Sequence, residues 1–320
     1  MLPPNTASPN RSIWKTVGQN QFENNVDRLS KTNFIPEPHV LPKKDWPKQS
    51  GDYALPFDVE KQLADDFAFI AAYDYGVQYV TVATVQASKD SPNSTTVRLA
   101  ANEGVNERAK DAISKVLAAM QRCASKELKR QTCAEEILDV VVKLNQNRIL
   151  GRLDSRYFKP NYMCKKPNLA QLPIRLKQQI EDFVPRRRSR MREGVQELSE
   201  EVNQFHQYFN QLEYSTVKSE RVGVLMLLVK QAFKITRDGF SFPSRLSQAV
   251  LNIRQRDISE ITKIANYWRI SQELSNISRS YRRFFQDVGL EALPRYRPFR
   301  SSGKESVFED DGDNAKGFVH

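Results

Sequence analysis

The chain has 320 residues, of which 39% are hydrophobic, and a formal net charge of +11. This length allows one large or two modest domains, and the slightly low hydrophobic fraction predicts a real core with polar ends. Only 12 glycines and a single place with strand-type alternation favour a mainly helical protein over a mainly β one.

The positive charge is concentrated in the second half of the chain. Residues 1–150 carry 19 Lys and Arg against 18 Asp and Glu, whereas residues 151–320 carry 30 against 20. Such an excess favours polyanionic partners such as nucleic acid, and it can equally serve solubility alone.

The cysteines and the apolar runs indicate the compartment. Cys123, Cys133 and Cys164 show no metal-type spacing, which is typical of reduced thiols in a cytoplasmic or nuclear protein. The N-terminal residues lack the basic-then-apolar pattern of a signal peptide. The most apolar run, residues 224–229, is far shorter than the ~20 residues that span a bilayer. We therefore expect a cytoplasmic or nuclear protein with no membrane segment.

The N-terminal segment, residues 1–55, is rich in prolines and polar residues. The repeated prolines exclude a long helix between Pro36 and Pro56. The segment is predicted to be extended and docked through aromatic residues such as Trp14 and Trp46, or else disordered.

Residues 56–151 are predicted to form helices and one β-hairpin. A helix opens at Pro56, runs to about Tyr75 and is ended by Gly76. Two β-branched runs, 79–85 and 95–100, flank a polar turn-forming loop and predict a hairpin near residues 79–101. Because an isolated hairpin is marginal in water, this one must pack against helices or pair with further strands.

Two more helices complete this region. One is expected from about 105 to 125 and another from about 133 to 150, with Gly151 as its stop. Residues 152–184 then form a connector with a short helix from Pro173 to Phe183, and we take this connector as the boundary between the halves.

Residues 185–290 are predicted to form a long-helix bundle. Apolar residues from Met191 to Leu212 follow a strict 4-3 spacing, which indicates a heptad seam. An antiparallel hairpin with the apolar helix 217–235 is favoured over an intermolecular coiled coil, and self-association through the 191–212 seam is the alternative. Further helices are expected at 244–254 and at 257–288, the latter capped by Gly289. Residues 291–320 are predicted as a loop-rich tail.

Taken together, these elements predict a mainly α fold, a multi-helix bundle-like body with one small β-hairpin near residues 79–101. Four stretches of the chain together carry a resemblance to a known family. They are the hairpin return 96–104, the helical body that follows, the Arg- and aromatic-containing stretch 294–302, and Gly317-Phe318-Val319-His320. With these stretches the chain resembles the region upstream of the catalytic domain in fungal proteins that carry a predicted OTT-like deaminase domain of the cytidine-deaminase-like superfamily.

The resemblance implies a zinc chemistry that this chain does not complete. His320 matches the first His of the family's His-Ala-Glu motif and is thereby expected as a zinc ligand. The catalytic Glu and the Pro-Cys-x-x-Cys ligands have no counterpart, and a zinc-bound water needs three protein ligands and a base. We therefore expect no cofactor for the chain as it stands, and zinc in a complete relative.

Two arginine clusters offer a different function. Five arginines fall within residues 186–192, and three more lie near the end of the last predicted helix, beside aromatic residues that suit single-stranded nucleic acid. The candidate nucleic-acid-binding residues are Arg186, Arg187, Arg188, Arg190, Arg192, Arg279, Arg282 and Arg283.

The sequence thus supports two hypotheses. The first is a non-catalytic helical module of a fungal deaminase-like protein, without a zinc site or a general acid/base. The second is a basic helical adaptor that binds nucleic acid or a protein partner.

Overall fold

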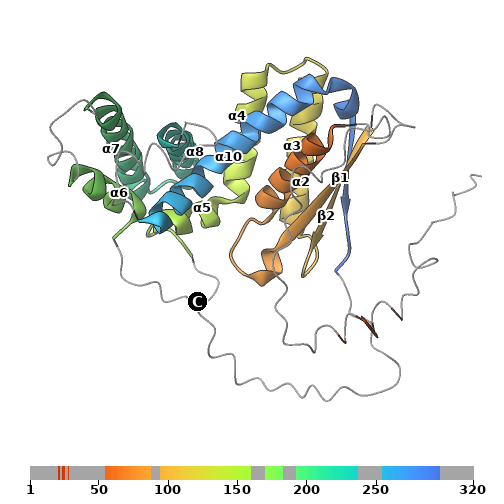
Figure 1. Ribbon diagram of the computed structural model, residues 1–320, viewed down its shortest axis with the longest axis horizontal. Coiled ribbons are helices and arrows are strands. Elements are labelled where there is room, and N and C mark those ends of the chain that lie inside the picture. Colours follow the sequence, from red (N-terminus) through yellow and green to blue (C-terminus); the bar gives the residue numbers. More distant parts are fainter. Residues whose placement is uncertain are drawn as a thin grey trace, which may run out of the picture. The chain divides into compact units, whose positions relative to one another are not determined.

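The computed structural model describes residues 55–87, 94–159, 170–182, 192–236 and 254–295, together with four positions between 21 and 28. Contacts divide the chain into one unit of residues 46–296, here called the main unit, and a second of residues 1–45 with 297–320. Apart from those four positions, the described residues all belong to the main unit (Figure 1). The predictions for residues 1–54, for the helix 244–254 and for the tail beyond residue 295 lie outside the described residues.

The main unit is mainly helical and contains one small sheet, so the predicted fold class is confirmed. No helix of the described residues is both long enough and apolar enough to cross a membrane. In chain order the elements are α2 (Phe57–Ala71), η3 (Val77–Tyr79), β1 (Thr81–Ala87), β2 (Ser94–Ala101), α3 (Glu107–Ala124), α4 (Arg130–Leu144), α5 (Gln146–Leu153), α6 (Leu172–Glu181), α7 (Arg192–Tyr214), α8 (Lys218–Ile235), α10 (Gln255–Ser280), η6 (Arg282–Phe285) and β3 (Asp287–Ala292).

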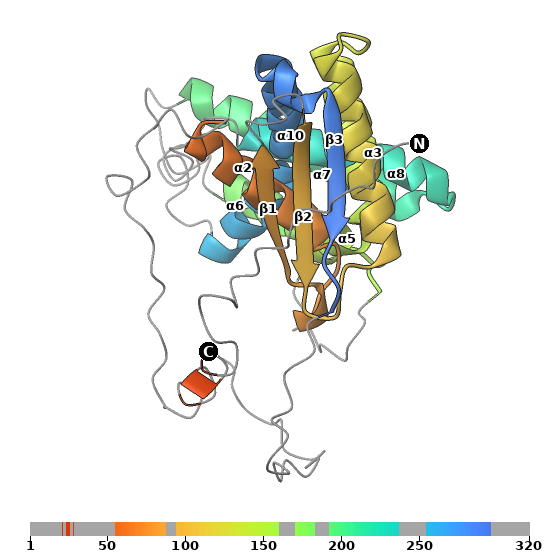
Figure 2. The same cartoon turned by 90° about the vertical axis from the view of Figure 1, so that its right-hand side faces the viewer.

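The predicted hairpin is present and is extended by a strand from the far end of the main unit. β1 and β2 pair antiparallel, with Val85 opposite Val97, and β2 pairs with β3 in parallel, with Val97 opposite Leu290. Helices α2 and α3 cover one face of this sheet (Figure 2). Val97 and Leu99 are buried on that face, as their alternation predicts, whereas Val82 is 61% exposed on the other.

Two of the helices predicted in residues 56–151 differ in the structure. The first helix ends at Ala71 rather than near Tyr75. The predicted helix 133–150 is two helices, because Asn145 separates α4 from α5. The Asn145 side chain is buried and donates hydrogen bonds to the carbonyls of Ile70 and Val141, both at 3.1 Å. A buried amide of this kind competes with the backbone for acceptors and ends the helix.

Gly151 does not stop a helix but lies inside α5. A Cβ atom at this position would stand 2.8 Å from ring atoms of both Tyr75 and Phe158. The glycine therefore permits the close approach of these two rings to the helix. Asp154, in the left-handed conformation at φ 55°, ends α5 instead.

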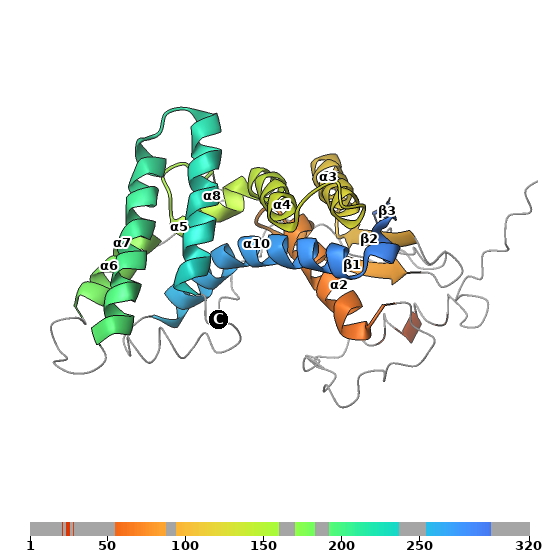
Figure 3. The same ribbon diagram turned by 90° about the horizontal axis from the view of Figure 1, so that it is seen from above.

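The heptad seam is buried within the chain. α7 and α8 are joined by a short connection and pack side by side as a helical hairpin (Figure 3), and α6 packs against α7 from another side. The described seam residues, Leu198, Val202, Phe205, Phe209 and Leu212, are all at most 1% exposed. The intrachain pairing that the sequence favours is thus observed. Self-association through the 191–212 seam stays a prediction, and it would require these contacts to be exchanged.

The last predicted helix is wrong at its C-terminal end. α10 stops at Ser280, and the chain continues through η6 into β3, so Gly289 lies opposite Thr96 in the sheet rather than capping a helix. Val288 and Leu290 are partly buried against the core on one face of β3. α10 itself packs against α3, α4 and α8 and is the central helix of the main unit.

Candidate functional site

Half of the arginines predicted to bind nucleic acid lie outside what the structure describes. Arg186, Arg187, Arg188 and Arg190 are outside the described residues, as is His320, while Arg192 begins α7 without a described side chain. These predictions therefore stay predictions.

The second arginine cluster is engaged at the C-terminal end of α3. Arg279 donates a hydrogen bond to the carbonyl oxygen of Cys123 at 2.9 Å, and Arg282 donates to that of Ala124 at 2.8 Å. Cationic donors at the last carbonyls of a helix satisfy orphan acceptors and favour the helix dipole. Arg283 is exposed in η6. Arg279 and Arg282 thus have a structural role at the end of α3, and this role explains them without any need for a ligand.

Within the described residues, no three His, Cys, Asp or Glu side chains gather in the way that a metal site requires. Cys123 and Cys133 are free and buried, and burial raises the pKa of the Cys133 thiol to about 12. A thiol of this kind is a small apolar side chain at neutral pH.

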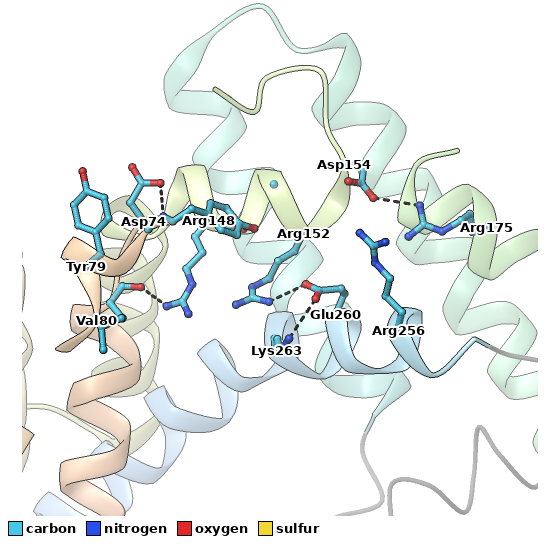
Figure 4. A pocket seen from close by; sticks show the side chains of 14 residues that line it. Asp74, Tyr79, Val80, Arg148, Arg152, Asp154, Arg175, Arg256, Glu260 and Lys263 are labelled. Carbon is cyan, nitrogen blue, oxygen red and sulfur yellow. Dashed lines mark hydrogen bonds and ion pairs between the residues drawn. The ribbon is translucent and has the colours of Figure 1, made fainter. Parts of the chain in front are cut away.

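The structure brings together a different set of cations, which line a cleft of about 350 Å³ that we call the basic cleft. Arg148 and Arg152, one helical turn apart, come from α5, and Arg175 comes from α6. Arg256 and Lys263 come from the same face of α10 (Figure 4). Three separate helices thus direct positive charge into one space.

Carboxylates offset only part of this charge. Arg152 Nη1 lies 2.8 Å from Glu260 Oε2, and Lys263 Nζ lies 3.2 Å from Glu260 Oε1. One carboxylate is therefore shared between two cations. Arg148 is held by the carbonyl oxygens of Ala72 and Phe69 at the end of α2, and its guanidinium lies 5.4 Å from the centre of the Phe69 ring. Burial lowers the pKa of Arg148, but an arginine keeps its charge at neutral pH.

Arg175 is the one cation of the cleft that is fully paired. Its Nη2 and Nε lie 2.7 and 3.1 Å from Oδ1 of the buried Asp257, and its Nη1 lies 3.2 Å from Asp154 Oδ2. Burial acts to lower the pKa of Arg175, yet the hydrogen bonds and charges of Asp257 and Asp154 outweigh it and raise the pKa. This side chain anchors α6 to α10 and is not available to a ligand.

Three other cations keep unused donors. Arg256 is exposed, extends from α10 into the cleft, and has no hydrogen bond or ion pair among the described residues (Figure 4). The Lys263 side chain is 43% exposed, and its one hydrogen bond among the described residues is with Glu260. The Arg152 side chain is only 6% exposed, and its Nε has no acceptor in the part of the chain that the structure describes. A buried donor without an acceptor costs about 1–3 kcal/mol, and this Nε has almost no accessible surface, so only Arg256 and Lys263 offer their donors to a ligand in the cleft.

Two tyrosines, Tyr75 and Tyr79, contribute to the wall of the basic cleft. Tyr75 donates a hydrogen bond from its hydroxyl to the carbonyl oxygen of Arg148 at 3.1 Å, and burial raises its pKa to about 12, so that it stays neutral. Tyr79 lies farther along the same wall. The cleft therefore combines positive charge with uncharged aromatic surface.

The sequence contains a partial signal for this cleft. Arg148 and Arg152 have the i, i+4 spacing of one helix face, as do Arg256 and Glu260. Nothing in the order of residues shows that α5 and the start of α10, about a hundred positions apart, face each other. Composition located the positive charge in the second half, and four of the five cations of the cleft, all but Arg148, come from it.

No protein-family model, curated protein or solved structure matches this chain.

Proposed function

We propose that the main unit is a binding module for a phosphate-bearing anion, which it holds in the basic cleft. One observation carries the proposal, namely the unused donors of the exposed Arg256 and Lys263 at a cationic space of about 350 Å³. Arginine forks and lysine ammonium groups are the side chains that proteins use for phosphate oxygens. The net charge of +11 would favour the approach of such a ligand.

The expected effect of removing the two exposed cations is a loss of affinity for a single-stranded oligonucleotide. We expect the double variant Arg256→Gln and Lys263→Gln to bind a fluorescein-labelled 12-nucleotide oligothymidylate about tenfold more weakly than the native protein. The dependence of log K on log salt should become shallower by about 0.7 for each lost phosphate contact. Fluorescence anisotropy at several salt concentrations measures both quantities.

A matched variant distinguishes the effect of the cleft cations on affinity from the effect of the net charge. Lys115→Gln with Lys143→Gln makes the same change in net charge at two exposed lysines of α3 and α4, whose side chains are 60% and 59% exposed. This pair should retain nearly native affinity. If it weakens binding as much as the cleft pair does, the attraction is diffuse and the proposed site is wrong.

A second proposal follows from the resemblance alone. We propose that the chain corresponds to the non-catalytic helical region that precedes a zinc-dependent deaminase domain, which would place the anion-binding module next to a catalyst acting on nucleobases. The supporting residues are Gly317-Phe318-Val319-His320. Reading the transcript beyond codon 320 tests this: Ala-Glu followed by Pro-Cys-x-x-Cys supports it, and an unrelated continuation removes it.

A further inference from the structure

A second cavity, of about 580 Å³, lies beside the basic cleft and shares Tyr79 with it. We call it the tyrosine cavity, and it is lined by Tyr73, Tyr79, the turn around Gly104 and the residues that follow β3 as far as Arg295. Both cavities have the volume of a small-molecule site. Tyr79 therefore stands in the wall between two spaces that each accommodate a group of roughly mononucleotide size.

The two spaces differ in chemistry. The basic cleft has five cations and three carboxylates in its lining. In the tyrosine cavity the charges are matched, since Arg295 pairs with Glu103 at 2.9 Å and Lys110 pairs with Glu107 at 2.6 Å. An anionic group is thus favoured on the side of Tyr79 that faces the basic cleft, and an uncharged group on the side that faces the tyrosine cavity.

Aromatic surface is the main feature of the tyrosine cavity. The rings of Tyr73 and Tyr79 meet edge to face with centroids 5.0 Å apart, and the Arg108 guanidinium lies 5.8 Å from the centre of the Tyr73 ring. Tyr73 and Tyr79 are both partly exposed. Edge-to-face contact fixes the two rings relative to each other, so an aromatic platform exists before a ligand arrives.

A ligand with alternating phosphates and planar rings fits this arrangement. Single-stranded nucleic acid is recognised by cationic grooves that follow its backbone and by aromatic side chains on which its bases stack. The bases of a duplex are stacked on one another and are not free to do this. We propose that the main unit binds single-stranded nucleic acid, with a base stacked on Tyr79 in the tyrosine cavity and the adjoining phosphates in the basic cleft. This inference rests on the proposed function and specifies its ligand.

The test compares two fluorescein-labelled probes of equal charge, a 12-nucleotide oligothymidylate and an abasic phosphodiester of the same length. Base stacking on protein aromatics predicts that the native protein binds the oligothymidylate about tenfold more tightly than the abasic probe. The variant Tyr79→Leu should lose this preference while keeping its affinity for the abasic probe. Tyr79→Phe retains the aromatic face and should retain the preference.

A tyrosine elsewhere provides the control. Tyr214 is 80% exposed at the end of α7, so Tyr214→Leu should leave the preference unchanged, and circular dichroism establishes that each variant is folded. Equal affinity of the native protein for the two probes, or equally tight binding of the corresponding duplex, would overturn the inference. If abasic binding still depends on Arg256 and Lys263 in that case, the proposed function stands alone. If neither probe depends on those two residues, the proposed function fails as well.

Discussion

Replacing Asp257 with alanine is expected to lower the free energy of unfolding by about 3–5 kcal/mol, because a buried guanidinium loses its main counter-ion. Asp257 is 1% exposed and Arg175 is 7% exposed. Asp257 Oδ1 accepts two hydrogen bonds from Arg175, and Oδ2 accepts one from Gln179 at 3.0 Å. After the substitution only Asp154, at 3.2 Å, remains to balance the charge. Urea denaturation followed by circular dichroism measures the loss.

Two further variants identify the cause of this loss. Asp111→Ala breaks an exposed pair with Lys115 and should cost no more than about 1 kcal/mol, since exposed pairs contribute little. The double variant Arg175→Met with Asp257→Leu removes both charges at once and should be more stable than Asp257→Ala alone. A loss of less than 1 kcal/mol in Asp257→Ala would show that the pair does not hold α6 to α10.

The stability of the protein is expected to fall between pH 4 and pH 7 because of Asp66 in α2. This carboxyl group is 1% exposed, and burial raises its pKa from 3.8 to about 7, with Glu273 adding to the rise while Arg269 and Gln62 oppose it. A pKa that is higher in the folded state means that folding favours the protonated form. The stabilisation is therefore complete below the unfolded pKa and is lost as the pH rises through about 7. Three units of pKa correspond to at most about 4 kcal/mol.

The variant Asp66→Asn should remove this pH dependence, because an amide does not titrate. Its free energy of unfolding, relative to the native protein, should therefore rise from pH 5 to pH 8. The neighbouring Asp65 supplies the control, since its side chain is 61% exposed and pairs with Lys61, and Asp65→Asn should follow the native pH profile. An Asp66→Asn profile parallel to the native one would mean that Asp66 is ionised throughout this range.

Much of the helical framework could be predicted from the sequence, because periodic burial leaves a periodic pattern. The seam from Leu198 to Leu212 is an example, since the same 4-3 spacing that indicates it is buried against α8. The errors occurred where tertiary contacts override local preference. Asn145 divides a helix because its amide donates to the Ile70 carbonyl of α2, and β3 follows α10 because β2 offers it a partner.

The candidate site was less predictable than the framework. The arginines chosen from the sequence were clusters of nearby residues, and two of those that the structure describes, Arg279 and Arg282, donate hydrogen bonds to carbonyl oxygens of α3. The cations of the basic cleft come from α5, α6 and α10, and these helices bring them together only in the folded chain. The i, i+4 pairs on α5 and α10 are the partial signal that such a site leaves, because no local pattern shows which helices face each other.

The parallel pairing of β2 with β3 also constrains the biosynthesis of the protein. β2 ends at Ala101 and β3 begins at Asp287, so a ribosome must synthesise the intervening helices before the sheet can be completed. During this interval the free edge of β2 exposes unpaired amide and carbonyl groups that neighbouring nascent chains can pair with. Pairing across such a sequence separation is also slow. Chaperones that shield the hairpin until the last strand arrives would therefore raise the yield of folded protein in cells.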